Sequence, residues 1–310
     1  MSLKAVAEAP SKVIITGEHF VVHGAWALAA ALPRGVRVEM SNSTRFEATS
    51  DRFASQQTQL KPVGLVVEEM AREFSAKPKV KVSISSAIPQ GAGLGSSAST
   101  MVAVASAFSR LNSLGLGPEE VARFSMAGER AIHGKPSGID SAICSHGGVL
   151  LFRAGRRPKK VSFTGHRSLI VSYSGQSRST KGQIRRVSSF KETLPGLFSV
   201  VSESVSDLSL QAAERLAGRD MRGLGKVLSL NQAVLGFIGV SNPTLNLMVE
   251  YLDSTGSYGA KLTGAGGGGS VVAVAPEAKE KSIVSGLKAR GFETFIARVP
   301  AKGVRSWLER

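Results

Sequence analysis

Every second residue from Gly91 to Gly95 is glycine, and this first glycine loop separates two patterns of opposite kind. Residues 80–85 alternate between apolar and polar side chains, which predicts a half-buried strand, whereas apolar side chains between Ala98 and Leu111 recur at helical spacing. Glycine lacks a Cβ, so the backbone can approach a ligand closely. The amides that open a helix, together with its dipole, favour an anion. The sequence therefore predicts a strand, a tight turn and a helix that form an anion-binding loop.

Ser96 and Ser97 follow this loop at the start of the predicted helix. A serine hydroxyl in that position can cap the helix by accepting a hydrogen bond from a backbone amide. Alternatively, one hydroxyl can coordinate a metal ion that accompanies bound phosphates. The two residues alone leave both roles open.

Five of the six residues between Thr263 and Ser270 are glycine, and we call residues 264–269 the second glycine loop. Gly264, Gly266 and Gly269 satisfy the dinucleotide pattern GxGxxG, but a strand pattern rather than a helix follows them. The chain contains neither an HRD nor a DFG triplet and no Walker A sequence, which excludes protein kinases and P-loop enzymes. A flexible linker remains the alternative, although ordering so many glycines costs much entropy.

Two carboxylates, Glu129 and Asp140, are eleven residues apart across a predicted helix end. Residues 118–120 carry the proline and acids that start a helix, and Gly134 is a natural stop. The chain can then fold back so that one carboxylate holds Mg²⁺ and the other faces a substrate hydroxyl. The alternative is that both are solvated surface groups.

His19 and His23 have the four-residue spacing of a zinc-binding helix. However, Phe20 stands where the HExxH motif requires glutamate, so the pair does not predict a zinc site.

The chain carries 39 Lys and Arg against 23 Asp and Glu, a formal net charge of +16. No acidic residue lies between Asp140 and Glu192, whereas eleven cations fall from Arg153 to Lys191. Substrate phosphates, nucleic acid or solvent counterions could be attracted there. Aromatic residues make up only 6% and are scattered, so stacking platforms are not evident and nucleic acid is not expected as the primary partner.

The 310 residues include 42% hydrophobic residues but no apolar run of membrane-spanning length, which predicts a globular protein. Glu8 and Pro10 interrupt the apolar stretch that a signal peptide would need. The single Cys144 cannot form an internal disulfide and is expected to be a small buried residue in a reducing compartment. We therefore predict a cytoplasmic location.

Strand and helix patterns follow one another without strict alternation, which favours an α+β fold. We expect long helices over residues 181–233, and a strand, helix and strand after the second glycine loop, ending at Val299. The polar residues 41–62 suggest strand edges and a loop. A basic stretch near residues 153–165 suggests a domain boundary, giving domains 1–166 and 167–310.

Taken together, these segments resemble the GHMP family of small-molecule kinases over nearly the whole chain. The resemblance rests on five ordered motifs: Pro10 to Gly24, Gly91 to Ala98, Gly128 to Asp140, Arg178 to Lys181 and Lys261 to Gly269. The opening motif is similar to that of the family members that phosphorylate mevalonate. It differs from the openings of galactokinases, homoserine kinases and diphosphomevalonate decarboxylases.

The resemblance implies an N-terminal domain like ribosomal protein S5 domain 2 and a ferredoxin-like C-terminal domain, with ATP and substrate between them. It implies ATP-dependent phosphorylation of the C5 hydroxyl of mevalonate in isoprenoid biosynthesis, with Mg²⁺, in a cytoplasmic homodimer that does not bind membranes. Phosphomevalonate and homoserine are the alternative substrates within the family.

The resemblance also assigns roles. Asp140 would be the catalytic base, and Lys12 would bridge the hydroxyl and the γ-phosphate. Ser97 and Glu129 would hold Mg²⁺. The substrate would contact Glu18, His19 and Thr180. The nucleotide phosphates would lie against Gly91, Gly93, Leu94, Gly95, Ser96, Ser97, Gly264, Ala265, Gly266 and Gly267. The adenine pocket stays unassigned.

Overall fold

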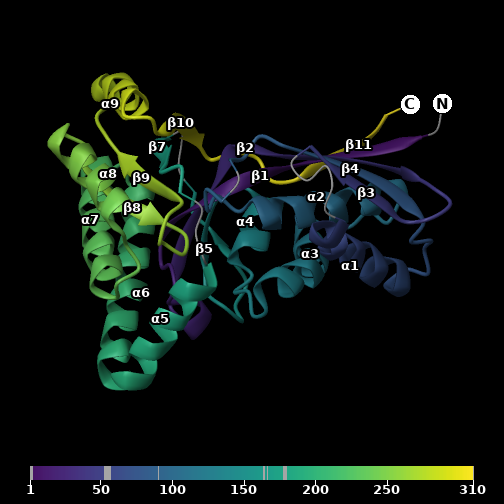
Figure 1. The fold of residues 1–310 in the computed structure, drawn as a ribbon, viewed down its shortest axis with the longest axis horizontal. Coiled ribbons are helices and arrows are strands. Elements are labelled where there is room, and N and C mark those ends of the chain that lie inside the picture. Colours follow the sequence, from purple (N-terminus) through teal and green to yellow (C-terminus); the bar gives the residue numbers. More distant parts are fainter. Residues whose placement is uncertain are drawn as a thin grey trace.

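The computed structural model describes residues 3–51, 57–89, 91–162, 165, 167–176 and 180–309. The described chain forms two lobes, each a β-sheet with helices packed on it (Figure 1). The α+β prediction is confirmed. No helix in the described ranges combines the length and the apolar character needed to cross a membrane.

The sheet of the first lobe has the strand order β11-β1-β2-β4-β3 in the described chain, with β5 beside β2 and β6 beside β5. Its strands are β1 (Lys4–Thr16), β2 (Ala27–Asn42), β3 (Glu47–Ser50), β4 (Val80–Ser86), β5 (Val149–Phe152), β6 (Lys159–Lys160) and β11 (Arg305–Glu309). All pairs are antiparallel except β3 with β4. The apolar start of β2 is completely buried, because helices cover it on one side and the second lobe contacts it as well.

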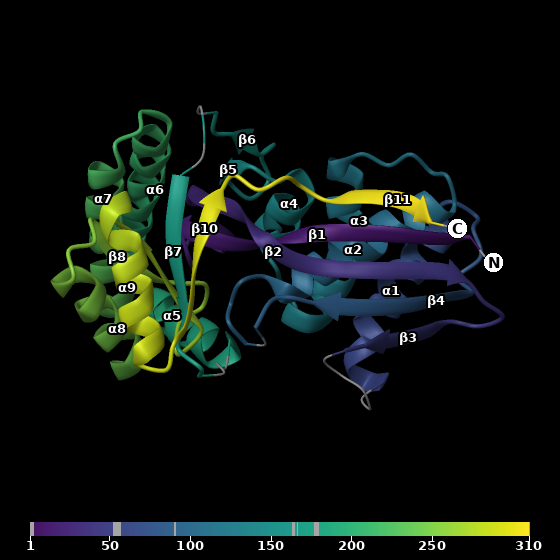
Figure 2. The same cartoon turned by 90° about the horizontal axis from the view of Figure 1, so that it is seen from above.

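Helices cover one face of this sheet (Figure 2). They are α1 (Gln57–Glu73), α2 (Ser96–Leu111), α3 (Pro118–His133) and α4 (Ile139–His146). α2 packs against both β1 and β2 and buries eleven of its sixteen residues, which explains its small and apolar sequence. This placement brings the start of α2, and with it the first glycine loop, against the middle of β1.

The strand edges expected within residues 41–62 are present in β2 and β3, but the loop expected up to Pro62 is wrong where a helix has formed. Residues 47–50 form β3, and α1 begins at Gln57 with Pro62 inside it; residues 52–56 lie outside the described residues. Val63, Val66 and Met70 recur at helical spacing and are buried in the core. Burial of this face outweighs the hydrogen bond that proline removes.

The sheet of the second lobe is antiparallel, with the order β10-β7-β9-β8 in the described chain. Its strands are β7 (Arg167–Tyr173), β8 (Gly259–Thr263), β9 (Ser270–Val274) and β10 (Glu293–Val299). Its helices are α5 (Thr180–Thr193), α6 (Pro195–Ala217), α7 (Met221–Phe237), α8 (Pro243–Ser254) and α9 (Glu277–Ala289). Helices separate β7 from β8 and β9 from β10, the β-α-β-β-α-β arrangement of a ferredoxin-like lobe, as expected.

A final strand, β11, was not expected from the sequence. The chain leaves β10, returns to the first lobe and pairs β11 with β1, so that both described ends lie side by side (Figure 2). The chain passes from one sheet to the other between β6 and β7, near the proposed boundary at residue 166, but residues 305–309 lie in the first sheet. One hydrophobic core includes residues of both lobes, among them Ala30 and Val272. The domain limits stay a prediction.

Candidate active site

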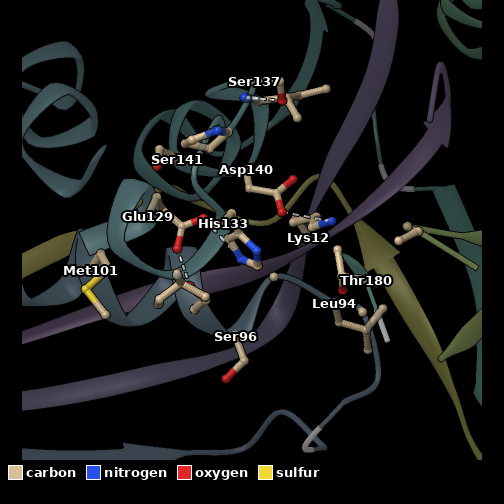
Figure 3. Close-up of a pocket in the computed structure, with 18 of the residues that line it drawn as sticks. Lys12, Leu94, Ser96, Met101, Glu129, His133, Ser137, Asp140, Ser141 and Thr180 are labelled. Carbon is tan, nitrogen blue, oxygen red and sulfur yellow. Dashed lines mark hydrogen bonds and ion pairs between the residues drawn. The ribbon is translucent and has the colours of Figure 1, made fainter. Parts of the chain in front are cut away.

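A cavity of about 960 Å³ opens between the two lobes. Its wall is formed by the end of β1, the first glycine loop, α2, α3, α4, α5 and the start of the second glycine loop. Figure 3 shows the side chains that face its centre. Most of the residues predicted to act in catalysis, from motifs far apart in the chain, line this one cavity.

Lys12 and Asp140 form an ion pair in the cavity, with 3.1 Å between Nζ and Oδ2 (Figure 3). Lys12 follows a register shift in the pairing of β1 with β2, and its side chain is 4% exposed. Its backbone amide donates to the carbonyl of Leu94, which attaches the first glycine loop to β1. Asp140 lies in the first turn of α4 and is 33% exposed, so its carboxylate is open to a ligand.

The first glycine loop needs its glycines for two reasons. Gly91, Gly93 and Gly95 all have φ between 75° and 77°, a region that other residues rarely adopt. A Cβ on Gly95 would also lie 2.7 Å from Cγ and 2.9 Å from Cε of Lys12. Gly95 therefore allows the loop to pass directly against the buried lysine.

The helix that follows the loop starts without a side-chain cap. Its N-cap residue is Gly95, and neither Ser96 nor Ser97 caps it, so the capping alternative is wrong. The amides of a first helical turn have no partner within the helix. They are therefore suited to bind the oxygens of an anion in the cavity.

Glu129 is buried beside Ser97, whose hydroxyl donates to its carboxylate (Figure 3). α3 can approach α2 closely at Gly128 because glycine has no Cβ. A Cβ at this position would lie 2.3 Å from the sulfur of Met101. Burial raises the pKa of Glu129 to about 7, against the lowering effect of the Ser97 hydrogen bond. His133, which the sequence analysis missed, lies one turn later on α3, with Nε2 3.9 Å from Glu129 Oε2. The four-residue spacing was the signal that could have identified it.

Ser97 and Glu129 suit a hard cation such as Mg²⁺, which prefers oxygen ligands. Within the described ranges there is no group of three or more His, Cys, Asp and Glu side chains that could hold a metal ion. Mg²⁺ is usually bound by one or two carboxylates together with substrate phosphates. The residues therefore fit Mg²⁺ when a phosphate-bearing ligand supplies the remaining oxygens.

Glu18 lines the cavity, so its predicted contact with the substrate stays a prediction, but it also forms an ion pair that the sequence did not indicate. Its carboxylate accepts a hydrogen bond from Lys261 Nζ, and the two side chains are 2% and 0% exposed. Burial raises the pKa of Glu18 and lowers that of Lys261, and each charge opposes the shift of the other. The pair connects the turn that follows β1 to β8, and so joins the two lobes. Lys261 was missed as a partner, although a lysine between Ala260 and Leu262 interrupts an apolar strand pattern.

His19 and Thr180 both line the cavity. His19 has a φ of 66°, and its Nε2 lies 3.0 Å from the carbonyl oxygen of Ala265. Thr180 begins α5 and lies on the Lys12 side of the cavity in Figure 3. Arg178 and Ser179 of the same motif lie outside the described residues.

Only the start of the second glycine loop faces the cavity. Gly264 and Ala265 line it, but Gly266 and Gly267 do not. A Cβ on Gly266 would lie 2.1 Å from the carbonyl oxygen of Val240, and one on Gly267 would lie 2.3 Å from Gln183 Nε2. These two glycines therefore permit close packing, and their contact with the nucleotide stays a prediction.

One end of the cavity, which the sequence left unassigned, is apolar. It is lined by Leu60 and Val63 of α1, Ile84 of β4, Ile88 after β4 and Met101 of α2. Flat aromatic groups bind well to apolar walls of this kind. The cavity thus combines an apolar end, an anion-binding centre with the Lys12–Asp140 pair, and a wall formed by α5.

Comparison with known proteins identifies related chains. The family model for the GHMP kinases N terminal domain matches residues 61–148. The family model for the GHMP kinases C terminal domain matches residues 209–293. The mevalonate kinase of Aeropyrum pernix is 33% identical, over 98% of this chain and 99% of that protein.

Solved structures share the fold. The Leishmania major mevalonate kinase in complex with R-mevalonate has a TM-score of 0.82 at 28% identity, over 96% of each chain. A Streptococcus pneumoniae phosphomevalonate kinase also has a TM-score of 0.82, at 17% identity over 95% of this chain and 99% of that one. The fold is therefore shared by enzymes with different substrates, so the fold by itself does not identify the substrate.

Gly95→Ala tests the contact between the first glycine loop and Lys12. Gly115→Ala is the control, because Gly115 also has a positive φ but has nothing within 4 Å of its Cβ position. Both changes should cost about 1–2 kcal/mol for the left-handed backbone. Gly95→Ala should cost about 1–3 kcal/mol more, because the methyl group displaces Lys12. Urea unfolding measures the free energy of unfolding of both variants. Equal losses of stability in the two would contradict the close contact between Gly95 and Lys12.

Glu18→Gln and Lys261→Met test the buried ion pair. Each single change should lower the free energy of unfolding by about 3–5 kcal/mol, because it leaves an uncompensated buried charge. The double variant should lose much less than the sum of the two. Additive losses in a denaturant titration would rule out the coupling.

Glu129→Gln tests the raised pKa of the buried carboxyl. In the folded protein Glu129 holds a proton up to about pH 7, whereas its ordinary pKa is 4.5. Its contribution to stability, about 3 kcal/mol, is complete below pH 4.5 and lost as pH rises through about 7. With a chelator present, we expect Glu129→Gln to gain thermal stability relative to wild type between pH 5 and pH 8. Glu68→Gln, an exposed control on α1, should follow wild type; parallel profiles for all three proteins would refute the shift.

Proposed function

The chain belongs to the GHMP kinase family, and from this premise we propose that it transfers the γ-phosphoryl group of ATP to the C5 hydroxyl of mevalonate. The observation that carries the proposal is the Lys12–Asp140 ion pair, set between the first glycine loop and α5. The choice of mevalonate is supported by full-length relatives at 33% identity that are mevalonate kinases.

In this proposal ATP lies along the first lobe. Its adenine would occupy the apolar end near Leu60 and Ile88, and its phosphates would lie against the amides that start α2. Gly264 and Ala265, at the start of the second glycine loop, would lie against the phosphates from the side of the second lobe. Mg²⁺ held by Ser97 and Glu129 would neutralise charge on the phosphate oxygens.

Asp140 would orient the hydroxyl and accept its proton. The hydroxyl oxygen forms a bond to the γ-phosphorus while the bond to the bridging oxygen of ADP breaks, and the proton passes to the carboxylate. A carboxylate is too weak a base to remove an alcohol proton before the reaction begins. However, little charge develops on the nucleophile in a loose transition state, so late acceptance suffices.

Lys12 would hold the ammonium charge between the carboxylate and the transferred group. It is buried, its backbone is bonded to Leu94, and its side chain is confined by Gly95. It therefore needs little reorganisation during the reaction. Preorganised charges of this kind are worth about 3–4 kcal/mol each where water is excluded.

The substrate would enter on the side of His19 and Thr180. Glu18 also lines the cavity, with one carboxylate oxygen bound by Lys261, and its contact with the substrate stays a prediction. The cytoplasmic location and the homodimer predicted from the resemblance stay predictions.

Asp140→Asn tests the proposed function together with a substrate panel. Wild type should release ADP with mevalonate but not with phosphomevalonate, homoserine or galactose. Asp140→Asn keeps the shape of the side chain but not its basicity, so turnover should fall by about 10²- to 10⁴-fold while ATP still binds. Asp207→Asn, an exposed control on α6, should keep wild-type turnover. Wild-type turnover in Asp140→Asn would refute the role of Asp140, and a different preferred substrate would refute the choice of mevalonate.

A further inference from the structure

α5 presents one face to the cavity. Thr180, Ile184, Val187, Ser188 and Lys191 line it, and their positions, at offsets of 0, 4, 7, 8 and 11 residues, lie along one side of the helix. The last of them carries a positive charge near the cavity mouth.

Lys191 is a cation without a carboxylate partner in the part of the chain that the structure describes. Lys12 at the cavity centre is paired with Asp140, whereas no salt bridge among the described residues involves Lys191 or Lys135. The polar neighbour of Lys191 is His23, whose Nδ1 lies 3.3 Å from Nζ. Burial lowers the pKa of His23, and the charges of Lys191 and Lys135 lower it further, which favours the neutral ring; the contact therefore leaves the charge of Lys191 unbalanced.

Lys191 is also held in place. Its Nζ lies 5.6 Å from the ring centroid of Phe198 on α6, and His23 meets the same ring edge-on at 5.0 Å. Phe198 is buried and packs against Phe20 and Phe190. A cation supported by two ring systems loses less freedom on binding a ligand than a free surface lysine does.

The arrangement of residues along the cavity leaves the side of α5 for the second substrate. In Figure 3, Thr180 lies on the Lys12 side of the Lys12–Asp140 pair, and Glu129 and Met101 lie on the other side. Phosphates near Ser97 and Glu129 therefore leave the α5 side for the second substrate. A substrate with its hydroxyl at Asp140 would then extend along the wall that α5 forms from Thr180 to Lys191, and mevalonate carries its carboxylate at the end opposite that hydroxyl.

We propose that Lys191 binds the carboxylate of the substrate and thereby selects a hydroxy acid over an uncharged alcohol. The inference rests on the proposed function and extends it to a residue that none of the five motifs contains. His23 and Phe198 hold the ammonium group at the mouth of the cavity. When the substrate covers this site, the ion pair forms with less water around it than an exposed pair has, and so contributes more.

A diffuse field from the basic segment is the competing explanation. Residues from Arg153 to Lys191 carry eleven cations, and their summed field would attract any anion without contact. Arg185 lies on the same helix but does not line the cavity. Removing its charge tests the field without touching the proposed contact.

The experiment compares Lys191→Met, Lys191→Arg and Arg185→Met with mevalonate and with 3-methylpentane-1,3,5-triol, which replaces the carboxylate by an alcohol. In Lys191→Met the KM for mevalonate should rise about tenfold, the lower range for a hydrogen bond to a charged group. The KM for ATP and kcat should change less than about twofold, and kcat/KM for the triol should stay at the wild-type value. Lys191→Arg should recover most of the mevalonate KM, and Arg185→Met should resemble wild type.

Three results would overturn the inference. Equal losses for mevalonate and the triol would mean a structural role for Lys191, equal effects of Lys191→Met and Arg185→Met would mean a diffuse field, and an unchanged KM for mevalonate would mean no contact. If wild type itself does not phosphorylate mevalonate, the proposed function fails, and the inference fails with it. Activity of wild type on mevalonate thus separates the two.

Discussion

The buried ammonium of Lys12 is the constraint around which the site is arranged. A charge at 4% exposure is costly unless it is paired, and Asp140 at 3.1 Å provides the pair. To place the lysine there, β1 shifts its register, Leu94 accepts the lysine's backbone hydrogen bond and residue 95 must be glycine. Strand, loop and α4 are therefore fixed relative to one another by the backbone amide and the side chain of one residue.

The two lobes are connected by polar contacts as well as by a shared core. The Glu18–Lys261 ion pair joins the segment that follows β1 to β8, and the hydroxyl of Ser270, at the start of β9, donates to the carbonyl of Ala92 in the first glycine loop. Buried polar contacts of this kind favour one arrangement over its alternatives, because any other arrangement leaves charges and carbonyls without partners. The cavity between the lobes therefore has a defined shape before a ligand enters.

The sequence predicts local structure well where a signal is local. Proline with two acids marked the start of α3, and Gly134 marked its end. Structure that depends on long-range contacts was harder to predict from the sequence. Pro62 suggested a loop, although buried side chains stabilise a helix around it. The residues of β11 show no pattern that indicates their pairing with β1. In the site, the motifs identified Lys12 and Asp140, but nothing local shows that Glu18 turns to Lys261. That contact depends on two segments 243 residues apart.

The position of β11 has a consequence for how the molecule forms on the ribosome. Because β11 pairs with β1, the second lobe is an insertion in the chain of the first lobe. The first sheet then keeps an open edge at β1 until residues 305–309 have been synthesised. An open strand edge can pair with other chains. A nascent chain would carry this exposed edge throughout synthesis of the second lobe, which makes β1 a natural position for chaperone protection.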